Sequence, residues 1–282
     1  MSLVLEHLSK RFGKHSVLQG ISLEIAPGKA YAIIGPNGAG KTTLIKSILG
    51  FYRHSGKVTF FGLPFMEALA KQRVGYLPER LTFSPLLTSL GYLELQAKLR
   101  GIKFSILKKT TIATAEQLGL TPWLNTPLYQ FSKGMTRKLA FLQAVMHQPQ
   151  LLILDEPTDG LDPVARRIVL HMILDMLNEG TTVLITSHLL SDIERVAQNA
   201  GILLQGKIVA ETNLRSLKSF GQLSISLREE DNFAHDYLLH KGSTLEINGK
   251  VLTVANINYS NTNLEDWYLD VVSQQVKEGL PV

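Results

Sequence analysis

The stretch Gly35-Pro36-Asn37-Gly38-Ala39-Gly40-Lys41-Thr42 decides the fold of this 282-residue chain. It follows an apolar run at residues 30–34 that is typical of a buried strand, and it precedes residues 43–49, whose apolar side chains have helical spacing. The glycines allow a tight turn in which successive N–H groups face one anion, and the positive end of the following helix favours the same charge. We therefore predict a loop that binds phosphate.

The spacing G-x-x-x-x-G-K-[ST] is that of the phosphate-binding loop of nucleotide hydrolases, and it gives each side chain a role. Lys41 would reach the β- and γ-phosphates, and the Thr42 hydroxyl would bind Mg²⁺. The alternative is a glycine-rich turn that matches by accident, but the flanking strand and helix argue against it. The residues predicted to bind the nucleotide here are Gly35, Pro36, Asn37, Gly38, Ala39, Gly40, Lys41, Thr42 and Thr43.

The composition is that of a globular protein, with 45% hydrophobic and 19% charged residues. The net charge of +5 includes no block of five basic residues, so it does not itself indicate nucleic acid; it is compatible with ATP or with a membrane surface. Because there is no cysteine, disulfides and thiolate metal sites are excluded, and the cytosol is the expected compartment. We find neither a signal peptide in residues 1–10 nor an apolar run long enough to span a membrane. If the protein works at a membrane, we expect another chain to cross it.

Strands alternate with helices along most of the chain, which predicts an α/β layered fold with a largely parallel sheet. In such a fold the ligand site lies at the carboxyl ends of the strands. The expected strands are residues 3–8, 16–25, 30–34, 57–61, 72–77, 151–154, 182–186, 201–204 and 207–210, and the expected helices are residues 43–49, 136–146 and 163–178, with further helical spacing at residues 85–126.

Two strands end in polar residues that are candidates for chemistry. Asp155 and Glu156 follow the apolar residues 151–154, where they would deliver one carboxylate to a metal and the other to the reaction. His188 follows the β-branched strand at residues 182–186. Adjacent carboxylates can also form a solvated loop, and a lone histidine after a strand is more often structural. The nearby phosphate loop favours the functional interpretation, so we expect these side chains to meet it.

Three weaker features have ordinary explanations. Ser132 and Gly134 precede a helix and are commonly no more than a cap, and Asp162 before a proline has helix-start chemistry. Phe12 either stacks on a base or packs at a sheet edge, and chemistry alone favours packing.

The pattern changes near residue 213. Residues 222–227 and 244–255 are expected strands, the latter folded at Asn248-Gly249, and residues 231–240 and 264–276 are expected helices. Residues 213–282 are therefore expected to form a small α+β appendage with a role in packing or protein contact.

Taken in order, these stretches resemble the ATP-binding cassette of ABC transporters over about residues 1–212, with a helical insert at about residues 85–145. The resemblance implies a P-loop nucleoside triphosphate hydrolase fold with a RecA-like core. The phosphate loop looks like the family's Walker A motif, and residues 151–156 look like Walker B, with Glu156 as the catalytic glutamate. Ser132 and Gly134 look like part of the family signature, from which Lys133 and Met135 depart.

The resemblance assigns further roles. Phe12 would stack on adenine, which reverses the preference above; Asp162 would belong to the D-loop, and His188 would be the switch histidine. Glu79 stands where the family expects a glutamine that contacts Mg²⁺. A carboxylate still binds Mg²⁺, but its charge beside the γ-phosphate would slow hydrolysis or alter coupling. The implied metal ligands are Thr42, Glu79 and Asp155.

The implied function is that of an ATP-hydrolysing motor subunit that uses ATP and Mg²⁺, pairs with a second cassette in what we expect to be a homodimer, and drives a separate transmembrane permease. Residues 75–79, 132–135 and 263–266 resemble the exporter-associated, ABC-2 type branch, which implies export from a peripheral position on the cytoplasmic face of the inner membrane, without nucleic acid.

Two alternative functions stay open. One is a soluble ABC-type ATPase that clamps nucleic acid or ribosomes, although the chain has one cassette and no heptad run; the other is a regulatory module that holds ATP without hydrolysing it, although Glu156 and His188 are both present.

Overall fold

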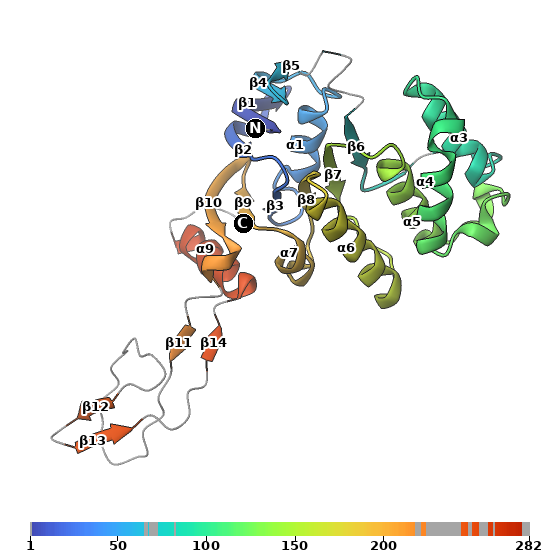
Figure 1. Cartoon of the computed structure of the whole chain (residues 1–282). Coiled ribbons are helices and arrows are strands. Elements are labelled where there is room, and N and C mark those ends of the chain that lie inside the picture. Colours follow the sequence, from blue (N-terminus) through green and yellow to red (C-terminus); the bar gives the residue numbers. More distant parts are fainter. Residues whose placement is uncertain are drawn as a thin grey trace. The chain divides into compact units, whose positions relative to one another are not determined.

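A computed structural model of the chain describes residues 2–64, 67, 73–81, 83–217, 221–223, 244–247, 250–253, 259–261 and 263–277. The chain divides into two compact units, one of which contains residues 1–211 and the other residues 212–281 (Figure 1). The candidate site residues of the sequence all lie in the first unit.

A six-stranded sheet forms the centre of the first unit, in the order β10-β9-β3-β8-β7-β6. Strand β3 pairs with β8 and β9, and β7 pairs with β6 and β8, all in parallel, which confirms the expected α/β fold with a largely parallel sheet. Every residue of β3, β7 and β8 is buried, as suits strands covered on both faces. The strands are β3 (Ala30–Ile34), β6 (Val74–Leu77), β7 (Leu151–Asp155), β8 (Thr182–Thr186), β9 (Asn199–Leu204) and β10 (Lys207–Asn213).

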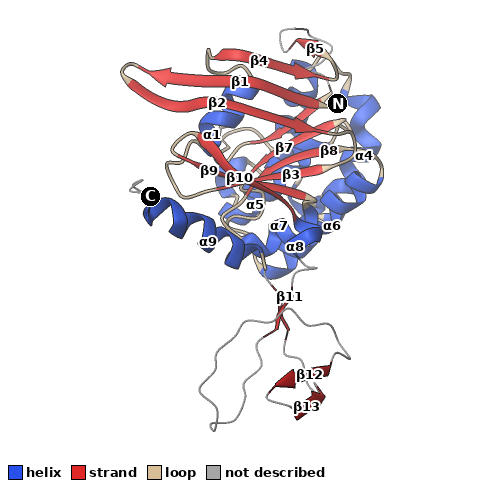
Figure 2. Ribbon diagram, turned by 90° about the vertical axis from the view of Figure 1, so that its left-hand side faces the viewer, coloured by secondary structure: helices blue, strands red, loops and turns tan. Residues whose placement is uncertain are grey.

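A second, antiparallel sheet, which we did not expect as a separate layer, is built by β2 (His15–Ile25), β1 (Leu3–Phe12), β4 (Ser55–Phe60) and β5 (Leu63–Pro64), in that order. Only Gly13 and Lys14 separate β1 from β2, and so short a turn joins antiparallel neighbours. Helix α1 (Lys41–Ile48) lies between the two sheets (Figure 2), and Leu44, Ile45 and Ile48 belong to one buried core with residues of both. The phosphate loop is therefore anchored from both sides.

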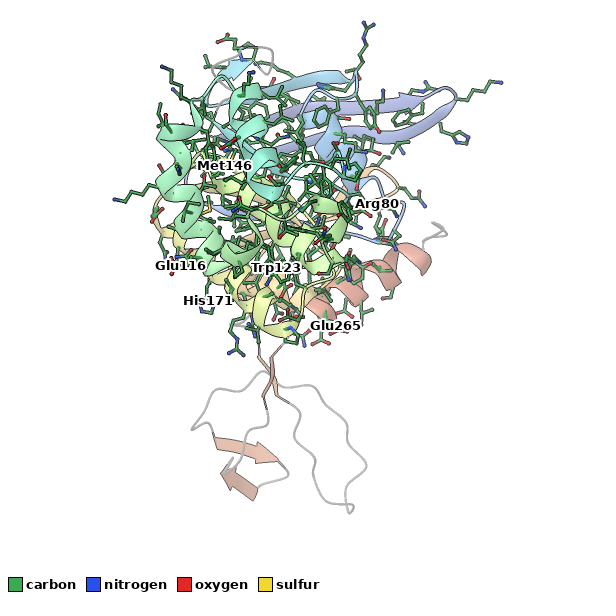
Figure 3. All side chains as sticks on the ribbon, turned by 90° about the vertical axis from the view of Figure 1, so that its right-hand side faces the viewer. Arg80, Glu116, Trp123, Met146, His171 and Glu265 are labelled. Atoms are coloured by element: carbon green, nitrogen blue, oxygen red, sulfur yellow. The ribbon has the colours of Figure 1, made fainter. Side chains whose placement is uncertain are left out.

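The remaining helices of the first unit lie beside the parallel sheet. The insert contains α3 (Ser89–Leu99), α4 (Phe104–Gln117) and two short 3₁₀ turns, η1 (Thr121–Trp123) and η2 (Leu128–Gln130), and it is followed by α5 (Lys133–Val145). Figure 3 looks onto this insert, where Glu116 and Trp123 lie. Helix α5 begins three residues earlier than we expected because Ser132 caps it; the Ser132 hydroxyl accepts a hydrogen bond from the Met135 N–H (3.2 Å). Helix α6 (Pro163–Asn178) was expected, whereas the short α7 (Leu190–Val196) was not. Among the described residues, no helix has both the length and the hydrophobicity that a membrane span requires.

The second unit contains α8 (Leu214–Leu217), two pairs of short strands and α9 (Leu264–Lys277). Strand β11 (Gly221–Leu223) pairs with β14 (Tyr259–Asn261), and β12 (Thr244–Ile247) pairs in antiparallel fashion with β13 (Lys250–Thr253). The two strands expected on either side of residues 248–249 are therefore present, and those two residues lie outside the described residues. The helix that we expected at residues 231–240 lies outside the described residues.

A polar contact joins the helical insert to the parallel sheet. Arg100, at the end of α3, donates a hydrogen bond from Nη1 to the Val74 carbonyl (3.2 Å) and lies 3.4 Å from Nε2 of His147, which follows α5. His147 Nε2 is also 3.2 Å from the Val74 carbonyl. Burial, with a smaller effect of the Arg100 charge, lowers the pKa of His147 to about 4. The folded protein therefore holds this imidazole neutral.

This contact predicts that the free energy of unfolding of the protein decreases in mild acid. The unfolded chain protonates His147 near pH 6.5 and the folded chain only near pH 4, so its contribution is complete above pH 6.5 and is lost as the pH falls towards 4. The loss should reach about 3 kcal/mol near pH 4 and about 2 kcal/mol at pH 5. Urea unfolding at pH 7.5 and pH 5 measures it, and His147→Gln, which keeps polar partners for Arg100, should reduce the difference. His171→Gln, at an exposed position, is the control; equal pH dependence in both variants would contradict the assignment.

Candidate functional site

A cleft of about 500 Å³ lies at the carboxyl ends of β3, β7 and β8. Parallel strands bring residues that are far apart in the sequence to one edge of the sheet, and the phosphate loop, the end of β7 and the end of β8 meet there. The lining residues are Val17, Asn37, Gly38, Gly40, Lys41, Thr42, Thr43, Glu79, Asp155, Glu156, Asp159 and His188. Among these, sequence reasoning did not single out Val17 or Asp159.

The phosphate loop has a backbone that favours glycine at three positions. Gly35 lies so close to β9 that an added Cβ would be 2.3 Å from the Leu203 carbonyl oxygen, and Gly38 and Gly40 have φ 87° and 107°, in the left-handed region. Gly40 caps α1 without any side-chain hydrogen bond, so the first N–H groups of this helix are available to an anion. The loop is therefore shaped to offer its main chain to phosphate oxygens.

Lys41 lies over the same loop. Its Nζ donates hydrogen bonds to the carbonyl oxygens of Gly35 (2.6 Å) and Pro36 (3.1 Å). Burial lowers the pKa of the Lys41 ammonium, and the carboxylates across the cleft oppose that shift. A phosphate group would provide the counter-charge that the two carbonyls supply only in part.

Three oxygen ligands suited to Mg²⁺ lie together. Asp155 Oδ1 accepts a hydrogen bond from the Thr186 hydroxyl (2.6 Å), whereas Asp155 Oδ2 is buried without a hydrogen-bond partner among the described residues. Burial raises the pKa of Asp155. The Thr42 hydroxyl lies 3.5 Å from Glu79 Oε2 in the same cleft. A buried, unsatisfied carboxylate oxygen beside a hydroxyl and a second carboxylate fits a hard divalent cation.

Glu156 and His188 form a hydrogen-bonded pair. Glu156 Oε2 accepts from the His188 backbone N–H (3.1 Å) and lies 2.7 Å from His188 Nδ1. Glu156 has φ 53°, an uncommon conformation for a residue with a side chain, and its own N–H donates to the Thr186 carbonyl (3.0 Å). The geometry holds one carboxylate at the mouth of the cleft, where it can orient a water molecule.

Arg137 of α5 joins the segments that carry these carboxylates. Its guanidinium donates to four backbone carbonyls, those of Pro78 (2.7 Å), Glu79 (2.9 Å), Asp155 (2.6 Å) and Glu156. The residue is only 6% exposed. The sequence analysis missed the role of Arg137 because an arginine on an amphipathic helix usually faces solvent. The one sequence signal for a buried arginine here is that its neighbours on the helix pack into the core.

Several predicted site residues do not line the cleft. The Phe12 ring packs edge-on against Tyr52, with the ring centroids 5.2 Å apart. Asp162 caps α6 by accepting from the N–H groups of Val164 and Ala165 (both 2.9 Å). Ser132 caps α5, and Gly134 lies close to the Gly160 carbonyl. Gly35, Pro36 and Ala39 are also absent from the residues that line the cleft. The nucleotide-binding roles of all the predicted residues stay predictions.

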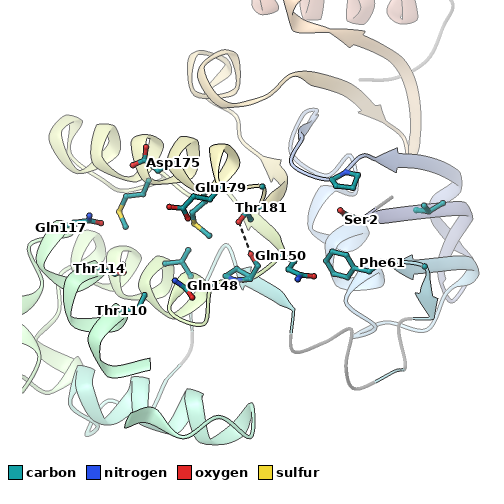
Figure 4. Close-up of a pocket in the computed structure, with 18 of the residues that line it drawn as sticks. Ser2, Phe61, Thr110, Thr114, Gln117, Gln148, Gln150, Asp175, Glu179 and Thr181 are labelled. Atoms are coloured by element: carbon teal, nitrogen blue, oxygen red, sulfur yellow. Dashed lines mark hydrogen bonds between the residues drawn. The ribbon is translucent and has the colours of Figure 1, made fainter. Parts of the chain in front are cut away.

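A larger cleft, of about 1040 Å³, lies at the opposite edge of the sheet (Figure 4). Gln150 and Thr181, which precede β7 and β8, line it, and the Thr181 hydroxyl donates to the Pro149 carbonyl (3.2 Å). None of the motif residues reaches this cleft. Size alone therefore does not identify the site, and the chemistry of the smaller cleft does.

Comparison with known proteins gives consistent results. A family model described as ABC transporter matches residues 18–159. The bacitracin transport ATP-binding protein BcrA of Enterococcus faecalis is 32% identical over 295 residues, covering 95% of each chain. The linearmycin resistance ATP-binding protein LnrL of Bacillus subtilis is 36% identical over 211 residues, covering 74% of this chain and 68% of LnrL. A solved ATP-binding subunit of an ABC transporter has a TM-score of 0.73 at 28% identity, covering 78% of this chain and 92% of that one.

The contacts of Arg137 predict a strong effect on stability. Arg137→Met removes the charge-assisted hydrogen bonds and leaves four carbonyls without their donor, which should cost about 3 kcal/mol or more. Denaturant unfolding measures the change. Arg167→Met, at an exposed position of α6, is the matched control and should change stability by less than about 0.5 kcal/mol. Equal stability of the two variants would show that Arg137 does not hold these segments.

Proposed function

This chain belongs to the ATP-binding cassette family of ABC transporters, in which it is an ATPase, and from that premise we propose how its residues bind and hydrolyse ATP and what it drives. The P-loop nucleoside triphosphate hydrolase fold that the sequence implied is confirmed. One observation carries the proposal, namely that the phosphate loop, the unsatisfied Asp155 oxygen and the Glu156–His188 pair share one cleft.

Different residues of the cleft have different roles in ATP hydrolysis. The phosphate-loop amides and Lys41 bind the β- and γ-phosphates and hold the γ-phosphoryl group in place. Glu156, fixed by His188, orients the attacking water and accepts its proton. Thr42, Asp155 and Glu79 would hold Mg²⁺, which would supply positive charge to offset that of the phosphate oxygens.

Glu79 is the feature in which this site differs from the family pattern. Its backbone is held by Arg137, its Oε2 faces Thr42, and its Oε1 lies 4.0 Å from the exposed Arg80 Nε. As a carboxylate beside the γ-phosphate, Glu79 adds a negative charge that the cation must offset. We infer that turnover by this chain depends more on the divalent cation than turnover by a glutamine-bearing relative would.

A second copy of the chain completes the site. Ser132 and Gly134 lie at the start of α5, outside the cleft of their own chain, and the positive end of that helix suits a phosphate on a partner. Two copies that pair head to tail about a two-fold axis would each place this helix end on the other's ATP. Phe12 and Asp162 would contribute to the nucleotide site in that closed dimer.

A separate permease is the proposed second partner. Phe51, after α1, and Leu86, before α3, are 63% and 80% exposed and lie on the core and on the helical insert. Large exposed apolar side chains are what a protein-binding surface requires, and we propose that these two residues contribute to the permease contact. The names of BcrA and LnrL, which refer to transport of bacitracin and resistance to linearmycin, favour export as the direction. A soluble ATPase that clamps nucleic acid or ribosomes is not favoured.

The role of Glu156 gives a direct test of hydrolysis. Glu156→Gln keeps the size of the side chain but removes the base, so turnover should fall by about 10²-fold or more while ATP still binds. With MgATP, the variant should accumulate as an ATP-bound dimer in size-exclusion chromatography. Glu116→Gln, on the exposed face of α4, is the control and should keep the parental rate. Parental turnover in Glu156→Gln would remove this residue from its role.

The proposed permease can be sought in the native cell. The tagged full-length chain, extracted gently with membranes, should copurify with a polytopic membrane protein in comparable amount. Leu86→Glu should lower that recovery, whereas Ile106→Glu, at an exposed position of α4 that is 70% accessible, should not. Recovery of the wild-type chain only with ribosomes or nucleic acid would overturn the transport role and leave the ATP site intact.

A further inference from the structure

The first 66 residues concentrate positive charge on one part of the surface. Glu24 is the only acidic residue between residues 7 and 66. We name as the basic hairpin surface the residues Lys10, Arg11, Lys14, His15, Arg53 and His54. They come from the tip of the β1–β2 hairpin and from the segment that follows α1. In the part of the chain that the structure describes, no carboxylate forms an ion pair with any of them.

A hydrogen bond holds the two segments of the basic hairpin surface together. Lys10 Nζ donates to the Arg53 carbonyl (2.8 Å), which fixes the Arg53 segment beside the hairpin. Arg11 makes only a long contact, from Nη2 to the Lys14 carbonyl (3.5 Å), and its side chain is exposed. Arg11 and Arg53 therefore lie on neighbouring segments, and neither forms an ion pair with a carboxylate of the described residues.

The basic hairpin surface includes a cleft of about 500 Å³ whose lining suits phosphate. Arg11, Arg53 and His54 line it together with the polar side chains of Ser9, Ser16, Gln19 and Ser55. Guanidinium groups bind phosphate through paired N–H donors, and hydroxyl and amide groups add neutral donors. The site is separate from the ATP cleft, because the two share no lining residue.

Aromatic rings beside these cations point to a membrane rather than a soluble anion. Lys10 Nζ lies 5.4 Å from the Tyr52 ring centroid. Phe51, which we assign to the permease surface, is two residues from Arg53, so the two surfaces adjoin. Aromatic and basic side chains are enriched together where proteins meet lipid headgroups. The tip of the hairpin also projects beyond α1 and the parallel sheet (Figure 2).

We propose that the basic hairpin surface docks on the phosphate headgroups of anionic lipids, beside the permease. The proposal rests on the proposed function, because the permease brings the chain to the membrane. The lipid contact fixes the orientation of the cassette on the membrane, and its strength depends on the anionic lipid content and on salt.

Vesicle flotation with the purified full-length chain tests this docking. The wild type should float with phosphatidylcholine vesicles that contain 30% phosphatidylglycerol, should not float with pure phosphatidylcholine, and should be released at 0.5 M KCl. At about a fivefold gain in partitioning per basic residue, the triple variant Arg11→Gln/Lys14→Gln/Arg53→Gln should bind about 100-fold less. The triple variant Lys98→Gln/Lys108→Gln/Lys109→Gln removes the same charge from exposed positions of the insert and should bind like the wild type.

The other outcomes identify what would be wrong. Equal loss in both triple variants would show a response to net charge alone, and flotation with neutral vesicles would show that headgroup phosphate is not the attraction; either result overturns the proposal. Weaker binding of a fluorescent ATP analogue by the Arg11 triple variant, with unchanged flotation, would assign the surface to nucleotide. Binding of an RNA duplex without flotation would assign it to nucleic acid. Failure of the proposed function is distinguished because it would appear in Glu156→Gln turnover and not in flotation.

Discussion

The arrangement of the ATP site depends on three neighbouring parallel strands that are buried along their whole length. Because β3, β7 and β8 run in one direction, their carboxyl ends meet at one edge, and each end carries a different part of the chemistry: the phosphate loop, the two adjacent carboxylates and the histidine. The register pairs both Ile33 of β3 and Asp155 of β7 with Thr186 of β8, so the three strand ends lie level with one another. The distances between Lys41, Asp155 and His188 follow from that register rather than from contacts among the three residues themselves.

The sequence predicted correctly those elements whose pattern of apolar residues matches their burial in the structure. Strands β3 and β8 are continuous apolar or β-branched runs bounded by turn residues, and the structure gives both at the expected residues. The separate antiparallel sheet was not foreseen, because alternation in β1 and β2 shows that these strands are half-buried but not which strand lies beside them. The start of α5 was placed three residues too late, because Ser132 and Gly134 were both taken to precede the helix, whereas Ser132 is its cap and Gly134 already lies within it.

The candidate site was predicted unevenly for a similar reason. Residues within a contiguous motif, such as Lys41 and Thr42, could be assigned from spacing, since the loop supplies its own geometry. Arg137 could not be assigned in this way, because its role comes from four backbone carbonyls on two distant segments. Every residue has a backbone carbonyl, so the sequence does not show which ones will accept a hydrogen bond. Phe12 illustrates the opposite case: a side chain can be expected at a ligand, but its contact with Tyr52 depends on how two segments pack.

The clamp made by Arg137 has a mechanical consequence. The Arg137 guanidinium donates hydrogen bonds to the Glu79 segment and to the end of β7, whereas the backbone of Arg137 belongs to α5, the helix that Ser132 caps. A shift of the Glu79 segment relative to the end of β7 would stretch one of these buried hydrogen bonds, so Arg137 couples the positions of the two segments. A small displacement at Glu79 is therefore passed through Arg137 to helix α5.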